Sequence, residues 1–156
     1  MTISRQMLML CAAVSLCGCK VHNPGTIEGH VINFTKHHIT VRNRSTKNPQ
    51  SPTPENIDAG KVAFNHYCVA CHGMDGQNTG VPFADKMSPP PPLLTSPQVQ
   101  SYTDGQLKWI IDNGLQPSGM PASKDTLSDD EIWSIVLYLR RLPPAGSAGE
   151  PEMYSH

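Results

Sequence analysis

The sequence predicts an all-α domain of three to four helices, preceded by a targeting segment and an irregular N-terminal tether. Three stretches between residues 53 and 143 place apolar residues at helical spacing behind a capping residue, and no strand–helix–strand alternation runs through them. The chain of 156 residues suits one domain with appendages. A formal net charge of −1 argues against a nucleic-acid-binding protein, which would usually carry a basic face.

Residues 1–18 have the layout of a secretory signal peptide. Arg5 precedes the apolar run Met7–Leu16, which is too short to span a bilayer; a buried helix of the fold is the alternative. The run ends in Leu16-Cys17-Gly18-Cys19, which resembles the lipobox of bacterial lipoproteins. This resemblance implies cleavage before Cys19, lipidation of that cysteine and a place on the periplasmic face of a bacterial membrane. Lys20 directly after Cys19 favours the outer membrane.

Residues 19–52 are predicted to be a lipid-anchored tether. The segment is rich in His, Lys and Arg, contains short runs at 31–34 and 38–41 with strand-like composition, and ends in the linker-like sequence 48–52. Beside a membrane its bases would contact anionic headgroups or sugars, each worth about 1 kcal/mol. Two alternatives for this segment are a solvated spacer and a copper or zinc site formed by its histidines.

The domain proper is expected to span residues 53–143, and its first helix to run from Thr53 or Asn56 to Cys71. Thr53 and the following proline are a good cap and first-turn pair. Gly60 and Phe64 lie on one face of this helix, and the same face continues to Cys68 and Cys71. Glycine inside a helix costs roughly 1 kcal/mol relative to alanine, so another backbone is expected close to Gly60.

Cys68-Val-Ala-Cys71-His72 is the pattern of c-type haem attachment. Residues three and four apart share one helix face, so both thiols can form thioethers to one porphyrin while His72 reaches the iron. A zinc half-site and a thioredoxin-like pair are the alternatives. No second Cys pair completes four zinc ligands, and no βαβ pattern surrounds the motif. The sequence therefore predicts one covalently bound haem c.

Residues 73–101 are rich in Gly and Pro, and a loop this long is explained if it wraps a flat cofactor. The run Pro89–Pro92 favours extended geometry, and one of its carbonyls can accept the Nδ1 hydrogen of His72. A rigid surface turn is the alternative.

The second predicted helix begins at the capping box Thr103–Gln106 and ends at Asn113-Gly114. Tyr102 and Trp109 are packing residues or donors to a haem propionate, and Trp109 is the preferred candidate for that contact.

Met120 is predicted to be the second axial ligand, because haem iron held by His and Met is the arrangement of electron carriers and the thioether raises the potential. Gly and Pro flank it on a loop before the last helix. Met74 lies too close to His72 to reach the opposite haem face, and Met153 lies beyond the last helix. Met87 is the second choice.

The last helix is predicted from Asp129 to about Leu142, behind a capping box that starts at Ser128. It is apolar nearly all round, which indicates that neighbours cover it on most sides. Two arginines suit its C-terminal dipole, and Pro143-Pro144 ends it. Residues 144–156 are predicted to be a disordered tail.

Together these residues resemble the class I monohaem cytochromes c, in the small bacterial form related to the haem subunits of cbb3-type oxidases. The match covers roughly residues 55–143 and implies the cytochrome c fold. It also implies that Gly60 and Phe64 pack against Tyr138, and that Pro92, in a Pro-x-Leu pattern, faces His72; Pro91 is the other register. For residues 20–52 and the tail the family offers no role.

Three functions are consistent with this reading. The first is a membrane-tethered carrier of single electrons between respiratory-type redox partners, in which six-coordinate iron leaves no site for a substrate. With six bases against ten acids, the haem domain could be steered toward a basic partner. The second is a dedicated haem subunit of an exported oxidoreductase or terminal oxidase complex. The third, a haem enzyme or gas sensor, needs a vacant sixth position, so we expect no enzymatic activity.

Overall fold

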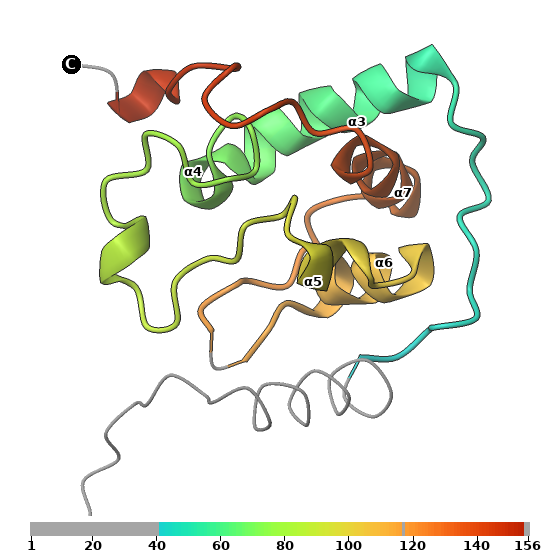
Figure 1. Cartoon of the computed structure of the whole chain (residues 1–156). Helices are drawn as coiled ribbons and strands as arrows, with labels where there is room; N and C mark the ends of the chain where they lie inside the picture. The colour runs from blue at the N-terminus through green and yellow to red at the C-terminus, as the bar shows by residue number, and fades with distance from the viewer. Residues whose placement is uncertain (1–40, 117, 155–156) are drawn as a thin grey trace, which may run out of the picture. The chain divides into compact units, whose positions relative to one another are not determined.

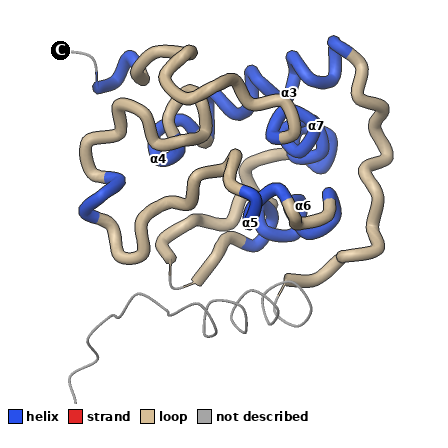
Figure 2. The backbone as a smooth tube through the Cα atoms, in the orientation of Figure 1, coloured by secondary structure: helices blue, strands red, loops and turns tan. Residues whose placement is uncertain are grey.

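The computed structural model describes residues 41–116 and 118–154, and within these ranges every regular element is a helix (Figures 1 and 2). The longer helices are α3 (Pro54–Tyr67), α6 (Asp104–Asn113) and α7 (Asp129–Leu139), and the short ones are α4 (Val69–His72), α5 (Pro97–Gln100), η2 (Ala84–Lys86) and η3 (Glu152–Tyr154). The β-type pairing in these residues is limited to an isolated bridge between Leu115 and Met120. The predicted all-α class is confirmed. None of the described helices is long and apolar enough to cross a membrane.

Helix α7 forms the centre of the domain, with α3 packed on one side and α6 on another (Figure 1). Every residue from Ile132 to Leu139 is buried, as the nearly uninterrupted apolar sequence predicted. This one helix supplies six of the fifteen residues of the apolar core, and the others come from segments packed around it.

The crossing of α3 and α7 depends on Gly60. A Cβ atom at this position would overlap the backbone carbonyl of Ser134, so the two helix backbones meet here with no room for a side chain. One turn further on, the rings of Phe64 and Tyr138 pack at a centroid distance of 5.4 Å and an interplanar angle of 59°. The close approach expected from a glycine inside a helix is confirmed, as is the contact between the two aromatic residues.

Side-chain caps fix where the three longer helices begin. The hydroxyl of Thr53 accepts from the N–H of Asn56 at the start of α3. Thr103 and Ser128 form complete capping boxes with Gln106 and Glu131, respectively, at the starts of α6 and α7. Both predicted capping boxes are therefore present, and each satisfies two backbone N–H groups that would otherwise lack partners.

The predicted boundary between tether and domain at residue 52 differs from the structure. Val41 is buried in the core. The side chain of Asn48 donates to the carbonyl of Trp133 (3.0 Å), and that of Gln50 donates to the carbonyl of Asp130 (3.0 Å). Residues 41–52 therefore pack along α7, because their polar side chains reach carbonyls on that helix. The predicted strand at residues 31–34 lies outside the described residues, as does most of the one at 38–41.

The segment predicted to be a disordered tail makes defined contacts in the structure. Residues 144–154 pack against the Cys68–His72 turn and the loop after it, and Pro151 is fully buried. The hydroxyl of Tyr154 donates to the backbone carbonyl of Ala70 (3.0 Å), and its ring meets that of Phe83 edge to face at 5.9 Å. The sequence of the tail is polar and rich in glycine, so its order comes from these few contacts and not from helical periodicity.

Candidate functional site

The motif Cys68–His72 lies where the first helix breaks. The helix predicted to run to Cys71 is in fact two helices: α3 ends at Tyr67, Cys68 has a φ of −113°, and α4 follows. The N–H groups of Cys71 and His72 both donate to the carbonyl of Cys68, at 3.1 Å and 3.0 Å. This single turn therefore carries both cysteines and the histidine, and both thiols are free and half-buried.

The thiol of Cys68 is held in its neutral form. Burial, with Cys71 as a second cause, raises the pKa of Cys68 to about 12. Zinc binding requires thiolates and, in structural sites, four ligands. Among residues 41–116 and 118–154 no group of three or more His, Cys, Asp or Glu side chains is placed to hold a metal ion. The alternative of a zinc half-site therefore has no support in the described part of the chain.

The imidazole of His72 is half-buried and neutral, and its Nδ1 atom is fully buried. Burial lowers the pKa of His72 to about 4, and the backbone carbonyl of Pro92 acts in the opposite direction. The Nδ1 atom is nonetheless buried without a well-formed hydrogen bond, so the carbonyl of Pro92 lies near the ring but out of good alignment. A neutral ring whose Nδ1 lies near a carbonyl is suited to offering Nε2 to a metal. The residues present fit a covalently held haem.

Asn78 connects this turn to the proline run. Its backbone N–H donates to the carbonyl of His72 (2.8 Å), and its side-chain amide donates to the carbonyl of Pro91 (2.8 Å). Its φ is 62°, a left-handed conformation that Asn adopts more readily than most residues. Asn78 thus fixes the segment that brings Pro92 to the histidine ring. Sequence reasoning missed this residue.

Asp75 is a fully buried carboxylate in the same loop, with 0% of its surface exposed. It accepts hydrogen bonds from the N–H of Gln77 (2.8 Å), the hydroxyl of Thr79 (2.6 Å) and the N–H of Gly146 (2.7 Å). Burial by itself would raise the pKa of Asp75, but these donors together lower it. The signal for this role was an Asp in a Gly-rich loop, where its side chain commonly bonds the backbone two residues on.

Met120 lies on the loop between α6 and α7, as predicted. Its carbonyl accepts from the N–H of Leu115 (3.2 Å), and its half-buried side chain packs against the core. Gly114, at a φ of 67°, lets the chain pass close to the Met120 carbonyl. Met87 approaches the same loop: its methyl group lies 3.8 Å from where a Cβ on Gly119 would be. Both candidate sulfur ligands therefore reach one region, and Met120 stays a prediction.

The other predicted site residues are placed as follows. Trp109 is half-buried and packs against the core, and its backbone carbonyl accepts from the side chain of Asn113 (2.9 Å). Tyr102 is buried, and burial raises its pKa. A propionate contact from Trp109 stays a prediction. Cys19, the predicted lipidation site, lies outside the described residues.

Comparison with known proteins agrees with this geometry. The sequence pattern of the family described as "Cytochrome C oxidase, cbb3-type, subunit III" matches residues 55–139. A quinohemoprotein alcohol dehydrogenase, ADH IIB of Pseudomonas putida, is 30% identical over 91 residues, which are 58% of this chain and 12% of the dehydrogenase. Cytochrome c4 of Thiocapsa roseopersicina is 28% identical over 107 residues, 69% of this chain and 49% of that protein. The chain thus matches half or less of each relative's length.

Proposed function

Because the chain belongs to the cbb3-type subunit III family of cytochrome c domains, we propose that it is an exported, membrane-tethered carrier of single electrons. Family membership by itself implies haem-based electron transfer and covalently bound haem c. Our proposal adds the ligands of the iron, the tether and the kind of partner.

The turn Cys68–His72 is the observation that carries the proposal. It brings two free thiols and one neutral, half-buried imidazole together. Haem c, when bound, supplies reversible one-electron exchange at its iron. The two cysteines would hold it by thioethers and His72 would offer Nε2, while Asn78, through the carbonyl of Pro91, would hold the segment whose Pro92 carbonyl lies near Nδ1 of His72.

Met120 is proposed as the ligand on the opposite face. It is half-buried, stands on a loop anchored at both ends by backbone hydrogen bonds, and packs against the core. A thioether ligand raises the reduction potential and fills the sixth position, which excludes substrates from the iron. The protein would then exchange electrons without acting as an enzyme.

The tether is proposed from the sequence. Cleavage before Cys19 and lipidation of that cysteine would anchor the protein on the periplasmic face of a bacterial membrane, with the outer membrane favoured by Lys20. Several acyl chains hold a protein far more firmly than one chain does.

A dedicated subunit of a larger complex is the second candidate function. The family's description names a terminal oxidase, and one relative is a quinohemoprotein dehydrogenase of which the matched region is 12%. A permanent partner would distinguish this candidate from a mobile carrier. The hypothesis of a mobile carrier predicts that the protein purifies alone and exchanges electrons with more than one small redox protein.

The test is the visible and near-infrared spectrum of the purified full chain. Haem that stays attached through denaturation, and is lost in the double variant Cys68→Ala/Cys71→Ala, supports covalent attachment at these residues. A weak near-infrared sulfur-to-iron band in the ferric protein supports the carrier. High-spin ferric iron that binds small ligands would overturn the carrier in favour of a haem enzyme or sensor.

A further inference from the structure

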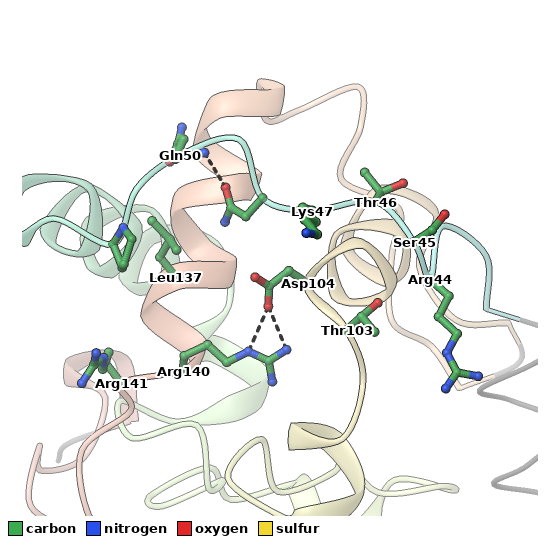
Figure 3. A pocket seen from close by; sticks show the side chains of 12 residues that line it. Arg44, Ser45, Thr46, Lys47, Gln50, Thr103, Asp104, Leu137, Arg140 and Arg141 are labelled. Carbon is green, nitrogen blue, oxygen red and sulfur yellow. Dashed lines mark hydrogen bonds and ion pairs between the residues drawn. The ribbon is translucent and has the colours of Figure 1, made fainter.

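A groove on the surface of the domain lies between residues 44–52 and the facing ends of α6 and α7 (Figure 3). One wall is the segment that precedes α3, and the other is formed by the first residues of α6 and the last turn of α7. Four of its lining residues are basic, namely Arg44, Lys47, Arg140 and Arg141. The fold places these bases around one groove, from two segments that lie far apart in the sequence.

Arg140 has a structural role in this groove. Its guanidinium donates twice to Oδ1 of Asp104 (3.1 Å and 2.8 Å) and also to the carbonyls of Gln100 (2.9 Å) and Tyr102 (2.6 Å). Asp104 is the one acid among the lining residues, and this pairing offsets its charge. The remaining bases of the groove are therefore not neutralised by the acid beside them.

Arg44, Lys47 and Arg141 are exposed, and none of them forms an ion pair with another described residue. Residues 41–154 as a whole carry nine bases against twelve acids, so three unpaired bases in one groove run against the charge of the domain. The first turn of α7, at the other end of the helix, carries three acids, namely Asp129, Asp130 and Glu131. The domain is thus polarised along α7, with the basic end at the groove.

We propose that this groove is the face that the domain turns toward an anionic phospholipid surface. Charge complementarity is the first argument, since lipid phosphates attract unpaired Lys and Arg side chains. Chain geometry is the second. The groove wall is formed by the first described residues, directly beside the point where the chain continues back toward Cys19. The inference rests on the proposed lipid anchor.

The tether is short enough for this attraction to act. About 20 residues separate Cys19 from Val41, so the chain between them can reach at most about 70 Å. Tethering at that range gives a local concentration of the order of millimolar. One base near an anionic surface favours contact about fivefold, so three would favour it roughly a hundredfold. Screening over about 8 Å at physiological salt means that the contact weakens as salt rises.

Docking through the groove would set the orientation of the carrier. The acidic start of α7 is at the other end of that helix from Arg140 and Arg141, and it directly follows the loop that carries Met120. A redox partner with a basic surface would then meet the domain at that end. The groove would thus hold one end of the domain at the lipid and present the other to the partner.

The experiment uses the haem-loaded, lipidated full chain bound to vesicles, with one new cysteine as a reporter. Ser45→Cys places the reporter in the groove, and Thr126→Cys places a matched neutral control near the other end of α7; both positions are exposed. The readout is the rate of labelling by an uncharged polyethylene glycol maleimide. Vesicles of phosphatidylcholine alone are compared with vesicles containing about one third phosphatidylglycerol.

We expect labelling of Ser45→Cys to slow at least fivefold on the anionic vesicles. The control at Thr126 should keep its rate, and high salt should remove the difference. Adding Arg44→Glu, Lys47→Glu and Arg141→Glu, with Arg140 left intact, should also remove it. Equal rates on both vesicles would overturn the inference while leaving the anchor in place. Failure of the protein to float with either vesicle would instead overturn the lipid anchor, and the membrane-facing role of the groove with it.

Discussion

The backbone N–H of Gly146 donates a 2.7 Å hydrogen bond to Oδ2 of Asp75, which ties the C-terminal segment to the loop that follows the haem-attachment turn. The same carboxylate also orders that loop internally through Gln77 and Thr79. Two elements with little apolar character of their own are therefore held together by one buried acid. The arrangement predicts that this side chain stabilises the whole proximal side of the haem site.

Asp75→Asn is expected to destabilise the haem-loaded protein by about 1–3 kcal/mol, because the amide nitrogen cannot accept from Thr79 and Gly146. Denaturant unfolding followed by the haem absorbance measures this loss. Asp85→Asn, at an exposed position, is the matched control and should change stability little. Equal stability of the two variants would show that the tail is held by other contacts.

Low pH should remove the contribution that Asp75 makes to the free energy of unfolding. Its pKa is lowered in the folded protein, so the unfolded chain binds the proton more tightly. The stabilising contribution is then fully present above the ordinary pKa of an aspartate and is lost as pH falls through the lower folded value. We expect the stability difference between wild type and Asp75→Asn to be constant near neutral pH and to shrink below about pH 4. A difference that grows in acid would contradict the assigned direction.

Gly60→Ala is expected to destabilise the domain by on the order of 3 kcal/mol, even though alanine favours helix by about 1 kcal/mol. The added methyl would overlap the carbonyl of Ser134, and the two helix backbones would have to separate. Thermal unfolding of the haem-loaded protein measures the change, with Lys61→Ala on the exposed face of α3 as control. A stability gain from Gly60→Ala would mean that the crossing is looser than the structure has it.

Sequence reasoning reached the parts of this fold that have a local signature. Short-range patterns predicted the two capping boxes, the burial of α7 on most sides and the close helix contact at Gly60. The structure confirms all three. Sequence reasoning missed the contacts made by single polar side chains across long separations. The bond between Asp75 and Gly146 joins a loop to the C-terminal segment, and the bond between Asn48 and Trp133 joins linker-like sequence to α7. Neither bond has a periodicity in the sequence that would predict it.

The choice between the two sulfur ligands can be decided by a matched pair of variants. Met120→Ala is expected to abolish the near-infrared sulfur-to-iron band and to lower the reduction potential, because the thioether raises it. Met87→Ala should keep both, although its methyl group approaches the same loop at Gly119. Spectra and redox titrations of the two ferric variants give the answer. Loss of the band in Met87→Ala with its retention in Met120→Ala would assign the ligand to Met87.

The segment between Val41 and α3 should contribute to stability mainly through two polar side chains. Asn48 donates to the carbonyl of Trp133, while Gln50 donates to the carbonyl of Asp130 and accepts from the buried hydroxyl of Ser134 at 2.8 Å. Replacing both Asn48 and Gln50 by alanine leaves that hydroxyl without its partner, so we expect a loss of about 2–3 kcal/mol.

Lys47→Ala, at an exposed neighbour with no ion pair among the described residues, is the control and should unfold like wild type. Denaturant unfolding of the haem-loaded protein separates the two cases. Haem loading should be unaffected in both variants, because neither side chain bonds to the attachment turn. If the double variant is as stable as Lys47→Ala, residues 41–52 are a tether after all, and their packing on α7 contributes nothing to the fold.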